Sequence, residues 1–538
     1  MTAQSREPGA AQFEYRITEP RERTLGRILS ERAAATPDRT CLVWKGAERI
    51  TFRELDDAVN RAATGLELQG VTHGDRVVVM SGNCPEFVYL IFALARLGAV
   101  IVTVNVHARG AQLEHMLMNS APKLIVVERD NVERVLEASA GLSPAPRVVV
   151  LGDADAAPQD RVIAAAAVFD QPPHSGHPEV QHTDLAQILY TSGTTGPSKG
   201  VMITHHQAYA FADYVSQAME MTDDDVYYTC LPLFHVNAQL SLLAVVLTGG
   251  CLALYERFSA SAFWGQVREA GATAVSLFGA MAYILYQQPP EVDLPTALRV
   301  CWAFPAPYDI LDDFERRYGF RVLTAYASTE ANFVAIGGLH DDLPSGAAGR
   351  VHPRFEVKVV DADDREVPPG VTGEIVTRPR DPFTMMLGYY RMPETTAEVF
   401  QNLWYHTGDA GRLDEDGYLY FVDRIKDVIR RRGENISSYE VEQVIVGHPA
   451  VAECAAMAVR SELSEDEVMV VIVPREDTTV VPAELVAWCS ERMAYFMVPR
   501  FVRVVPELPK TPTGKVEKYQ LRSGAPADGV WDAQAETH

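Results

Sequence analysis

The segment YTSGTTGPSKG, residues 190–200, combines side chains that together can hold a phosphate group. It carries three glycines, five serine or threonine hydroxyls and one lysine, Lys199. Glycine allows a positive φ and a close approach of the backbone, so the N–H groups of such a loop can turn toward an anion, and the lysine adds a positive charge. The apolar flanks at 187–190 and 201–204 predict strands, whereas a Walker loop opens a helix. A flexible surface loop is the alternative, which the lysine and the apolar flanks disfavour.

Two carboxylates farther along the chain have the chemistry to complete such a site. Glu330 ends the segment TAYASTE (324–330), and Mg²⁺ needs few carboxylates when phosphate oxygens fill the rest of its octahedral shell. Asp409 ends WYHTGD (404–409), and a carboxylate can accept two hydroxyl hydrogen bonds at once, which suits a vicinal diol. The alternatives are a helix start with a capping serine for the first segment and an ordinary Gly-Asp turn for the second.

Charged segments gather toward the C-terminus. DRIKD (423–427) has the mixed charge of a solvated linker. LPKTPTGK (508–515) predicts an irregular loop, in which prolines and a glycine present Lys515 at the end. A cation positioned beside developing negative charge can lower a reaction barrier by about 3 kcal/mol. Lys515 is therefore a candidate for catalysis.

The composition favours a cytoplasmic enzyme. A chain of 538 residues is too long for one core and predicts two or more domains. The formal net charge of −24 argues against a nucleic-acid partner, and seven scattered cysteines without a CxxC pair favour free thiols. The first twenty residues lack an apolar h-region, and Arg96 and Gly98 interrupt the longest apolar stretch, 87–104. We therefore expect no signal peptide and no membrane span.

Apolar runs alternate with helical segments in the first part of the chain. Strands are predicted at 76–80, 99–104, 123–127 and 147–151, and helices at 51–68, 85–97 and 110–119. This alternation is typical of βαβ units and a parallel sheet. Residues 152–184 are predicted to be a connecting segment, 273–278 and 298–302 to be strands, and a β subdomain is expected from Phe355 onward.

We therefore expect an α/β fold, with a large N-terminal domain of doubly wound βαβ sheets plus a β subdomain and a small α+β C-terminal domain. Charge rises at 423–427, where we place the boundary. The expected division is an N-terminal arm at 1–24, an N-terminal domain at 25–425, a C-terminal domain at 426–522 and a disordered tail at 523–538.

The motifs together resemble the adenylate-forming (ANL) superfamily, which contains acyl-CoA synthetases, other AMP-dependent ligases and luciferases. YTSGTTGPSKGV is similar to the phosphate-binding loop of that family, and TAYASTE to its YGxTE signature, with Ala327 in place of the usual glycine. GENISSYEVE (433–442) is similar to the crotonobetaine/carnitine–CoA ligase-like subgroup. The resemblance covers nearly the whole chain and implies that the C-terminal domain is a mobile lid.

The resemblance implies a role for each matching residue. Tyr326 would stack on adenine, Asp409 would bind ribose, Glu330 would hold Mg²⁺, and Lys515 would bridge the substrate carboxylate and the α-phosphate. The implied catalytic residues are Thr191, His235, Glu330 and Lys515. The residues implied to bind ATP or CoA are Thr191, Ser192, Gly193, Thr194, Thr195, Gly196, Lys199, Phe304, Ala306, Tyr326, Ala327, Ser328, Thr329, Asp409, Phe421, Arg424, Lys426, Gly433 and Lys515.

Two further implications concern the hinge and the acid pocket. Lys426 would be the hinge, and the arginines at 430–432 beside Gly433 could attract the CoA phosphates or form a surface patch. His235, in LPLFHVN (231–237), is as well suited to gate the acid as to be a satisfied core histidine. The expected acid pocket is polar and aromatic, and is formed by His235, Asn237, Phe278, Met281, Phe304, Asn332 and Phe333.

We predict an ATP-dependent, AMP-forming ligase that uses Mg²⁺ and CoA and acts on a small, medium or aromatic carboxylic acid. An acyl adenylate would form first, and the CoA thiol would then displace AMP. The alternative is an acceptor other than CoA, as in amide formation or nitrite-dependent diazotisation of an aryl amine. A catalytically idle nucleotide-binding protein is disfavoured because Lys199, Glu330 and Lys515 are all present. A homodimer is a further hypothesis about partners.

Overall fold

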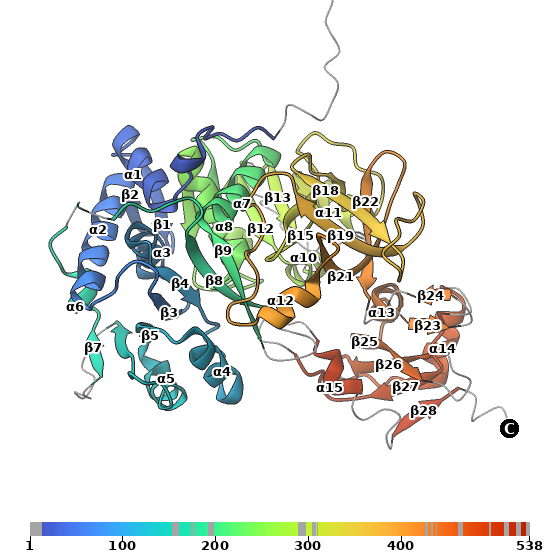
Figure 1. The fold of residues 1–538 in the computed structure, drawn as a ribbon. Coiled ribbons are helices and arrows are strands. Elements are labelled where there is room, and N and C mark those ends of the chain that lie inside the picture. Colours follow the sequence, from blue (N-terminus) through green and yellow to red (C-terminus); the bar gives the residue numbers. More distant parts are fainter. Residues whose placement is uncertain are drawn as a thin grey trace, which may run out of the picture.

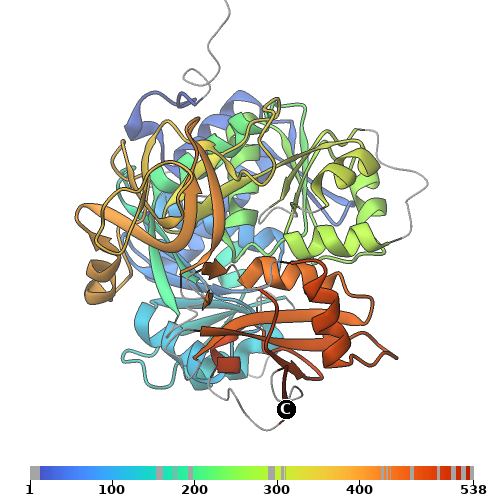
Figure 2. The same ribbon diagram turned by 90° about the vertical axis from the view of Figure 1, so that its right-hand side faces the viewer.

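The chain folds into two largely parallel sheets, a third antiparallel sheet and a C-terminal unit (Figure 1). The two parallel sheets interleave along the sequence, because the second contains strands from residues 40–51 and from residues 226–323. In the view of Figure 2 the orange and red C-terminal unit occupies the lower part of the molecule, level with the cyan end of the first sheet. The computed structural model describes residues 13–152, 161–173, 176, 178–191, 198–288, 297–303, 308, 310–425, 429–431, 434–436, 438–460, 466–493, 497–510, 516–522 and 529–533.

The first sheet carries the two ends of the candidate phosphate loop. In spatial order its strands are β7 (Val162–Ala164), β6 (Arg147–Leu151), β5 (Leu124–Glu128), β3 (Arg76–Met80), β4 (Val100–Thr103), β8 (Leu185–Thr191) and β9 (Lys199–Thr204). Neighbours are parallel except β8 and β9, which are antiparallel. The inner strands are continuous buried apolar runs, as expected of strands covered on both faces. The connecting helices are α3 (Pro85–Leu97), α4 (Gly110–Ser120), η2 (Arg129–Asn131), α5 (Val132–Ala138) and α6 (Ala166–Phe169).

The second sheet supplies the strands that lead to the expected acid pocket. In spatial order they are β14 (Arg321–Leu323), β13 (Val300–Ala303), β12 (Ala274–Leu277), β10 (Val226–Thr229), β11 (Cys251–Leu254), β1 (Thr40–Trp44) and β2 (Glu48–Thr51). All neighbours are parallel except β1 and β2. The helices of this part are η1 (Pro20–Glu22), α1 (Leu25–Ala35), α2 (Phe52–Leu68), α7 (His205–Ala218), α8 (Val236–Thr248), α9 (Phe263–Glu269), α10 (Gly279–Gln287) and α11 (Leu311–Tyr318).

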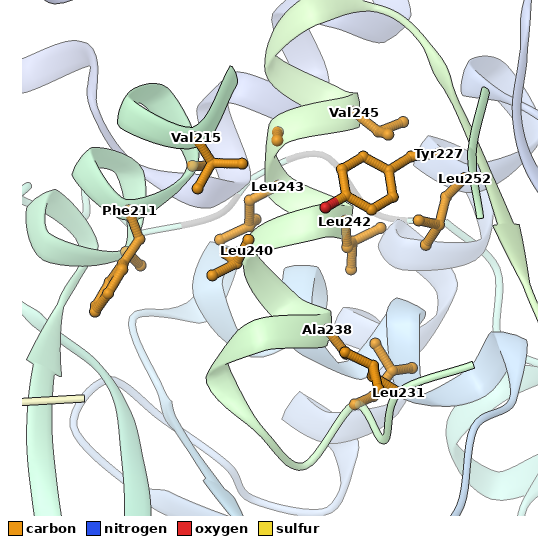
Figure 3. Packing of buried hydrophobic residues seen from close by; sticks show 14 of the residues in the cluster. Phe211, Val215, Tyr227, Leu231, Ala238, Leu240, Leu242, Leu243, Val245 and Leu252 are labelled. Carbon is orange, nitrogen blue, oxygen red and sulfur yellow. The ribbon is translucent and has the colours of Figure 1, made fainter. Parts of the chain in front are cut away.

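Helix α8 is buried on all sides, because every residue from Asn237 to Thr248 lies in the core. Figure 3 shows Phe211 and Val215 of α7 on one side of it, and Tyr227 of β10 and Leu252 of β11 on another. These side chains belong to one large buried cluster that spans both parallel sheets. The helix is therefore fixed along its length, and its N-terminal end, at residues 235–237, is held in place by the core.

The third sheet contains the candidate nucleotide residues. Its path is β15 (Ala325–Ser328), β16 (Asn332–Ile336), β17 (Gly349–Val351), β22 (Tyr418–Arg424), β21 (Trp404–Leu413), β19 (Gly373–Pro379) and β18 (Phe355–Val360), and β20 (Phe400–Gln401) pairs with β21. Neighbours are antiparallel, and α12 (Pro393–Val399) precedes β20. The sequence places the start of the β subdomain at Phe355, whereas this sheet already begins at Ala325.

The C-terminal unit is an α+β domain with its own apolar core. Its sheet has the order β25 (Val451–Arg460), β26 (Asp466–Pro474), β27 (Phe501–Val504) and β28 (Val530–Asp532), and β23 (Ile429–Arg431) forms a hairpin with β24 (Glu434–Ile436). The helices are α13 (Ser438–Val446), α14 (Pro482–Ser490) and α15 (Lys518–Arg522).

Two segments differ from the sequence-based expectations. The predicted connecting segment 152–184 contains β7 and α6, and α6 packs against α2. The predicted disordered tail contains β28, which pairs with β27, and Asp532 forms a two-bonded ion pair with Arg500 at 3.0 and 3.1 Å. Both segments are rich in Ala, Pro or polar residues. Their helix and strands are held in place by contacts with distant parts of the chain.

The described part of the N-terminal arm is anchored as well. Phe13 and Tyr15 are buried, and the Tyr15 hydroxyl lies 2.9 Å from that of Tyr214 on α7. The guanidinium groups of Arg23 and Arg354 lie 3.9 and 4.4 Å from the centre of the Tyr15 ring. Residues 13–23 therefore connect α7 to the segment that leads into β18.

Candidate active site

Both ends of the glycine-rich loop are fixed on neighbouring strands. Thr191 ends β8 and faces Lys199, which begins β9, and the Thr191 hydroxyl lies 3.5 Å from the Lys199 carbonyl oxygen, to which it donates. The Tyr190 hydroxyl donates to Asn119 of α4 at 2.7 Å. Ser192, Gly193, Thr194, Thr195 and Gly196 lie outside the described residues. The structure therefore defines the frame of the predicted phosphate loop and the position of its lysine.

Lys199 faces a tyrosine that connects it to Glu330. The Lys199 ammonium lies 5.0 Å from the centre of the Tyr389 ring. The Tyr389 hydroxyl donates a hydrogen bond of 3.2 Å to Glu330 Oε1. The structure thus brings together two predicted site residues that are far apart in sequence. Tyr389 was missed by sequence reasoning, although a Gly-Tyr pair before a helix that starts with proline is a usable signal.

The turn that carries Glu330 is held from beneath by α7. Gln207, which is fully buried, donates through Nε2 to the Thr329 carbonyl oxygen at 3.0 Å. The Ser328 hydroxyl accepts from the Ala331 N–H at 3.0 Å. Ser328 therefore closes a turn between β15 and β16, and the alternative of a helix start is wrong for this segment. Ala327 lies in β15 opposite Phe333.

The donor set around Glu330 fits a magnesium ion only together with a phosphate ligand. Among the described residues, no three His, Cys, Asp or Glu side chains are grouped closely enough to hold a metal ion. Glu330 offers hard carboxylate oxygen, and Mg²⁺ commonly takes one or two carboxylates plus phosphate oxygens and water. A metal at this position would therefore bind with a polyphosphate and not before it.

A second carboxylate, Asp409, is held on the third sheet by two partners. Its Oδ2 accepts a hydrogen bond of 2.6 Å from the Tyr326 hydroxyl, and its Oδ1 lies 2.7 Å from Arg424 Nε on the paired strand. The Asp409 side chain is 7% exposed. Burial and the negative charge of Asp409 raise the pKa of Tyr326, so its hydroxyl stays a donor. The carboxylate is thereby fixed as an acceptor before any diol arrives.

An exposed aromatic ring lies beside this carboxylate. The Phe421 ring stacks on Tyr326 with 6.1 Å between ring centres and 22° between planes. Tyr326 is 6% exposed, whereas Phe421 is 40% exposed. The Tyr326 hydroxyl thus donates to Asp409, while the face of the Tyr326 ring packs against Phe421. Phe421 offers the more accessible surface for a flat base.

The expected acid-pocket residues gather at the carboxyl ends of adjacent strands. Strands β10, β12 and β13 are parallel neighbours, and they lead into the segments that begin at Cys230, Phe278 and Phe304. Ligands bind at this edge in many open α/β sheets. His235 and Asn237 lie at the start of α8, and Phe278 precedes α10, which carries Met281. Phe304 and Ala306 lie outside the described residues.

The side chains in this region divide into structural and accessible groups. Asn332 is fully buried and donates to the Thr384 carbonyl oxygen at 3.2 Å while its Oδ1 accepts from the Phe333 N–H, so it fixes the backbone. Phe333 packs edge-on against Trp302, with 5.2 Å between ring centres. Asn237 Oδ1 is buried, and no donor among the described residues reaches it. Asn237 is thus better suited than Asn332 to meet a substrate.

The sequence matches known families over most of its length. Residues 29–390 match the AMP-binding enzyme family, and residues 440–515 match the AMP-binding enzyme C-terminal domain. The chain belongs to the AMP-binding enzyme family. It is therefore an ATP-dependent ligase that forms AMP, as the motifs implied.

Among the curated relatives of this AMP-binding enzyme are two crotonobetaine/carnitine–CoA ligases. That of Salmonella paratyphi A (strain ATCC 9150 / SARB42) is 33% identical over 515 residues, which cover 93% of this chain and 98% of the relative. That of Citrobacter koseri (strain ATCC BAA-895 / CDC 4225-83 / SGSC4696) is 32% identical over 517 residues, with the same coverage. The predicted resemblance to this subgroup is confirmed.

Solved structures share the fold of the AMP-binding enzyme described above. O-succinylbenzoate coenzyme A synthetase from Bacillus subtilis, in complex with AMP, is 27% identical, has a TM-score of 0.81 and covers 94% of this chain and 98% of its own. An anthranilate CoA ligase in complex with anthranoyl-AMP is 24% identical, has a TM-score of 0.83 and covers 93% and 96%, and its likeness bears on the fold alone. These likenesses confirm the predicted fold class.

Three predicted residues of the AMP-binding enzyme in its C-terminal part, Lys426, Gly433 and Lys515, lie outside the described residues. Arg431, one of the three clustered arginines, is buried and pairs with Glu467 at 2.6 Å. Arg431 therefore stabilises the C-terminal unit, and neither predicted use of the cluster holds for it.

A polar network joins the third sheet to the C-terminal unit of the AMP-binding enzyme. Asp423 Oδ2 accepts a hydrogen bond of 2.7 Å from the Ser438 hydroxyl at the start of α13. Lys518 donates to the same hydroxyl oxygen at 2.6 Å and pairs with Glu442 at 2.7 Å. On another element, Tyr283 of α10 donates to Gln443 of α13 at 3.1 Å. The unit is thus held against the strand that ends at Arg424.

Two further features lie apart from the site. A cavity of about 250 Å³ opens beside β1, β2 and β11 and contains none of the predicted site residues. Within the described part of the chain, no helix is both long and apolar enough to span a membrane.

Proposed function

We propose that the protein is an acid–CoA ligase, which activates a small, medium or aromatic carboxylic acid as an acyl adenylate and transfers the acyl group to CoA. The observation that carries the proposal is the placement of two carboxylates around β15. Tyr326 in this strand binds Asp409, and Glu330 follows the strand and is joined through Tyr389 to Lys199. One strand thus separates a fixed diol acceptor from a carboxylate and a cation suited to a polyphosphate.

In the first step the chain binds ATP and the acid and brings their reacting atoms into line. Asp409 accepts hydrogen bonds from the ribose hydroxyls, and Phe421 covers the base. Lys199 and the loop at 191–199 hold the leaving pyrophosphate, and Glu330 holds Mg²⁺, which neutralises phosphate charge when bound. Catalysis of phosphoryl and nucleotidyl transfer is mostly positioning and electrostatic stabilisation, so these groups suffice for most of it.

The acid would bind beside His235 and Asn237 at the carboxyl ends of β10 and β12. Its carboxylate attacks the α-phosphorus, the bond to the pyrophosphate oxygen breaks, and pyrophosphate leaves. In the second step the CoA thiol attacks the acyl carbon, the thiol proton is lost and AMP leaves. Lys515 bridges the carboxylate and the α-phosphate in the first step. The C-terminal domain then rotates about Lys426 and brings Gly433 to the adenylate for the second step. The relatives' names support CoA as the acceptor.

A half-reaction assay with Lys515→Ala tests the mechanism. We expect pyrophosphate release with ATP and acid to fall about 100-fold or more, as when a charge-stabilising donor is removed from an active site. Thioester formation from a supplied acyl adenylate and CoA should keep the wild-type rate. Equal loss of both half-reactions would contradict the assignment of Lys515 to the first step.

A substrate screen tests the function itself. Pyrophosphate release would be measured with short and branched carboxylic acids, aromatic acids, aryl amino acids and palmitate, each with and without CoA. Nitrite would be added in a separate series. Acyl-CoA formed together with AMP supports the proposal. AMP formed only in the presence of an amine or of nitrite would favour the alternative function, amide formation or nitrite-dependent diazotisation. A preference for palmitate would contradict the expected pocket for small, medium or aromatic acids.

A further inference from the structure

Tyr389 lies between the two charged groups that the proposed function assigns to the polyphosphate and its metal. Its ring faces the ammonium of Lys199 at 5.0 Å, a distance at which a ring face attracts a cation. Its hydroxyl donates to Glu330 Oε1 at 3.2 Å. The residue is 5% exposed, so both contacts are made in a largely dry environment, where each is stronger than in water.

The backbone of Tyr389 is fastened to the strand that begins with Lys199. Tyr389 forms an antiparallel bridge with Val201 of β9. On either side, the Met202 N–H donates to the Gly388 carbonyl at 3.0 Å and the Tyr390 N–H donates to the Gly200 carbonyl at 2.8 Å. The ring is therefore in register with Lys199 through the main chain and not only through the side-chain contact.

The segment before Tyr389 has a conformation that only glycine adopts readily. Gly388 has φ of +131°, and a Cβ atom there would lie 2.7 Å from Thr396 Cγ2. The Thr396 hydroxyl in turn accepts a hydrogen bond of 2.9 Å from the Tyr389 N–H. Helix α12, which carries Thr396, thus fixes the position of Tyr389 from the side opposite β9.

The Tyr389 hydroxyl occupies one of the two carboxylate oxygens of Glu330. It donates to Glu330 Oε1, and the buried ring of Tyr405 lies nearby. Burial, with the nearby negative charge of Glu330, raises the pKa of both tyrosines, so both hydroxyls keep their protons. Oε1 of Glu330 is occupied by this donor, whereas within the described part of the chain no hydrogen bond or ion pair reaches Oε2. The carboxylate is thereby oriented with one oxygen presented to a ligand.

We propose that Tyr389 is a positioning residue that orients Glu330 toward Mg²⁺ and Lys199 toward the polyphosphate, so that the metal and the nucleotide bind as one unit. Its hydroxyl acts on the metal through Glu330, and its ring acts on the phosphate through Lys199. The inference rests on the proposed function, because Glu330 and Lys199 take these roles there. Partners that orient a metal ligand typically change metal affinity by about 10- to 100-fold when they are removed.

Calorimetric titration of the full-length protein with ATP, with and without Mg²⁺, separates the two contacts. Tyr389→Phe removes the hydroxyl and keeps the ring, so ATP affinity in the presence of Mg²⁺ should fall about tenfold while metal-free ATP affinity stays unchanged. Tyr389→Leu removes both, so metal-free ATP affinity should also fall, by about two- to fivefold. Tyr390→Phe, the neighbour with the same chemistry, should match the wild type in both titrations.

A double-mutant cycle with Glu330→Gln distinguishes positioning from general weakening of the fold. If Tyr389 acts through Glu330, Tyr389→Phe should cause little further loss of Mg²⁺-dependent affinity in the Glu330→Gln background. The inference is overturned if the two losses add fully, or if Tyr389→Phe binds MgATP as the wild type does. Thr396→Val, which removes the hydroxyl that accepts from the Tyr389 N–H, should give a smaller loss than Tyr389→Phe, and this variant decides the question should Tyr389→Phe fail to fold.

The titrations do not depend on the acid or the acceptor. A protein that binds MgATP with the expected pattern of variants, but forms no acyl-CoA from any acid, would refute the proposed function and leave the role of Tyr389 standing. Normal acyl-CoA formation together with an unchanged MgATP affinity in Tyr389→Phe would refute the role of Tyr389 alone.

Discussion

At the scale of single residues, the proposed nucleotide site is built from polar groups that are paired with one another in the structure without a ligand. Asp409 receives the Tyr326 hydroxyl on one oxygen and the Arg424 guanidinium on the other. Each carboxylate oxygen has two lone pairs, so each can still accept a further hydrogen bond. Pairing of this kind reduces the reorganisation that binding requires, because the acceptor already has its charge and its direction.

Asp409→Asn should weaken AMP binding by about 10- to 100-fold, because a hydrogen bond to a charged group contributes about 1.5–3 kcal/mol and about 1.4 kcal/mol corresponds to a factor of ten. Calorimetric titration with AMP alone measures this without catalysis. Asp414→Asn is the matched control, since Asp414 lies at the turn of the same hairpin, where it accepts from the Tyr418 N–H at 2.9 Å. An unchanged AMP affinity in Asp409→Asn would remove Asp409 from the site.

At the scale of elements, local sequence patterns predicted the parallel sheets well. Strand β3, helix α3 and strand β6 begin and end at the predicted residues, because each is an apolar run bounded by turn or capping residues. Thr51, at the start of the helix predicted at 51–68, caps α2 and forms a capping box with Glu54. The third sheet was placed too late because β15 carries site residues, and Tyr-Ala-Ser lacks the apolar alternation of a strand.

Contacts between distant segments explain what the sequence did not show. Tyr389 and Glu330 are 59 residues apart, and nothing in either segment indicates the other. Likewise, the sequence around Arg431 indicates a basic surface cluster, because it does not show that Glu467 pairs with Arg431 in the folded chain. The motifs predicted candidate residues for the chemistry, whereas the residues that contact these candidates depend on how strands from different sheets meet.

Helix α6, which the sequence did not predict, packs closely against Gly65 of α2, and a substitution at this glycine tests that packing. A Cβ atom on Gly65 would lie 2.1 Å from the Val168 carbonyl oxygen. Gly65→Ala should therefore lower the free energy of unfolding by about 1–3 kcal/mol, although alanine is the better helix former by about 1 kcal/mol. Gly265→Ala, in the exposed part of α9 with no atom within 4 Å, should raise it slightly. Urea unfolding measures both, and stabilisation by Gly65→Ala would show that α6 does not pack there.

At the scale of the whole molecule, buried histidines lie where the arm, α7 and the third sheet meet. Burial lowers the pKa of His205 to about 4, and burial together with Arg23, His182 and Arg354 lowers that of His206 to about 3. Burial and Arg354 lower the pKa of His352 to about 3. Burial acts in the opposite sense on Asp213 of α7, whose pKa it raises to about 6. The three histidines of this joint therefore stay neutral in the folded chain down to about pH 4, whereas Asp213 becomes neutral only below about pH 6.

These four groups make the stability depend on pH in a direction that can be derived. Below about pH 6.5 the three histidines gain protons in the unfolded chain but not in the folded one, so their contribution is lost as pH falls. Asp213 is protonated below about pH 6 in the folded chain but ionised down to about pH 3.8 in the unfolded chain. Unfolding in this range therefore releases one proton from Asp213, which offsets the proton taken up by one of the three histidines. Two protons are therefore taken up on unfolding between about pH 6 and pH 4, and these groups lower the free energy of unfolding by about 3 kcal/mol per pH unit.

His206→Leu should reduce this slope by about half, because it removes one of the two net protons, or about 1.4 kcal/mol per pH unit. Both ring nitrogens of His206 are buried, and among the described residues neither has a hydrogen-bonding partner, so leucine replaces it without breaking a hydrogen bond. His340→Gln, whose side chain is 76% exposed, should leave the slope unchanged. Urea unfolding at quarter-unit steps from pH 6 to pH 5, inside the range derived above, gives the slopes. A His206→Leu slope equal to that of the wild type would mean that His206 is protonated in the folded protein, and that the arm and α7 do not exclude water from it.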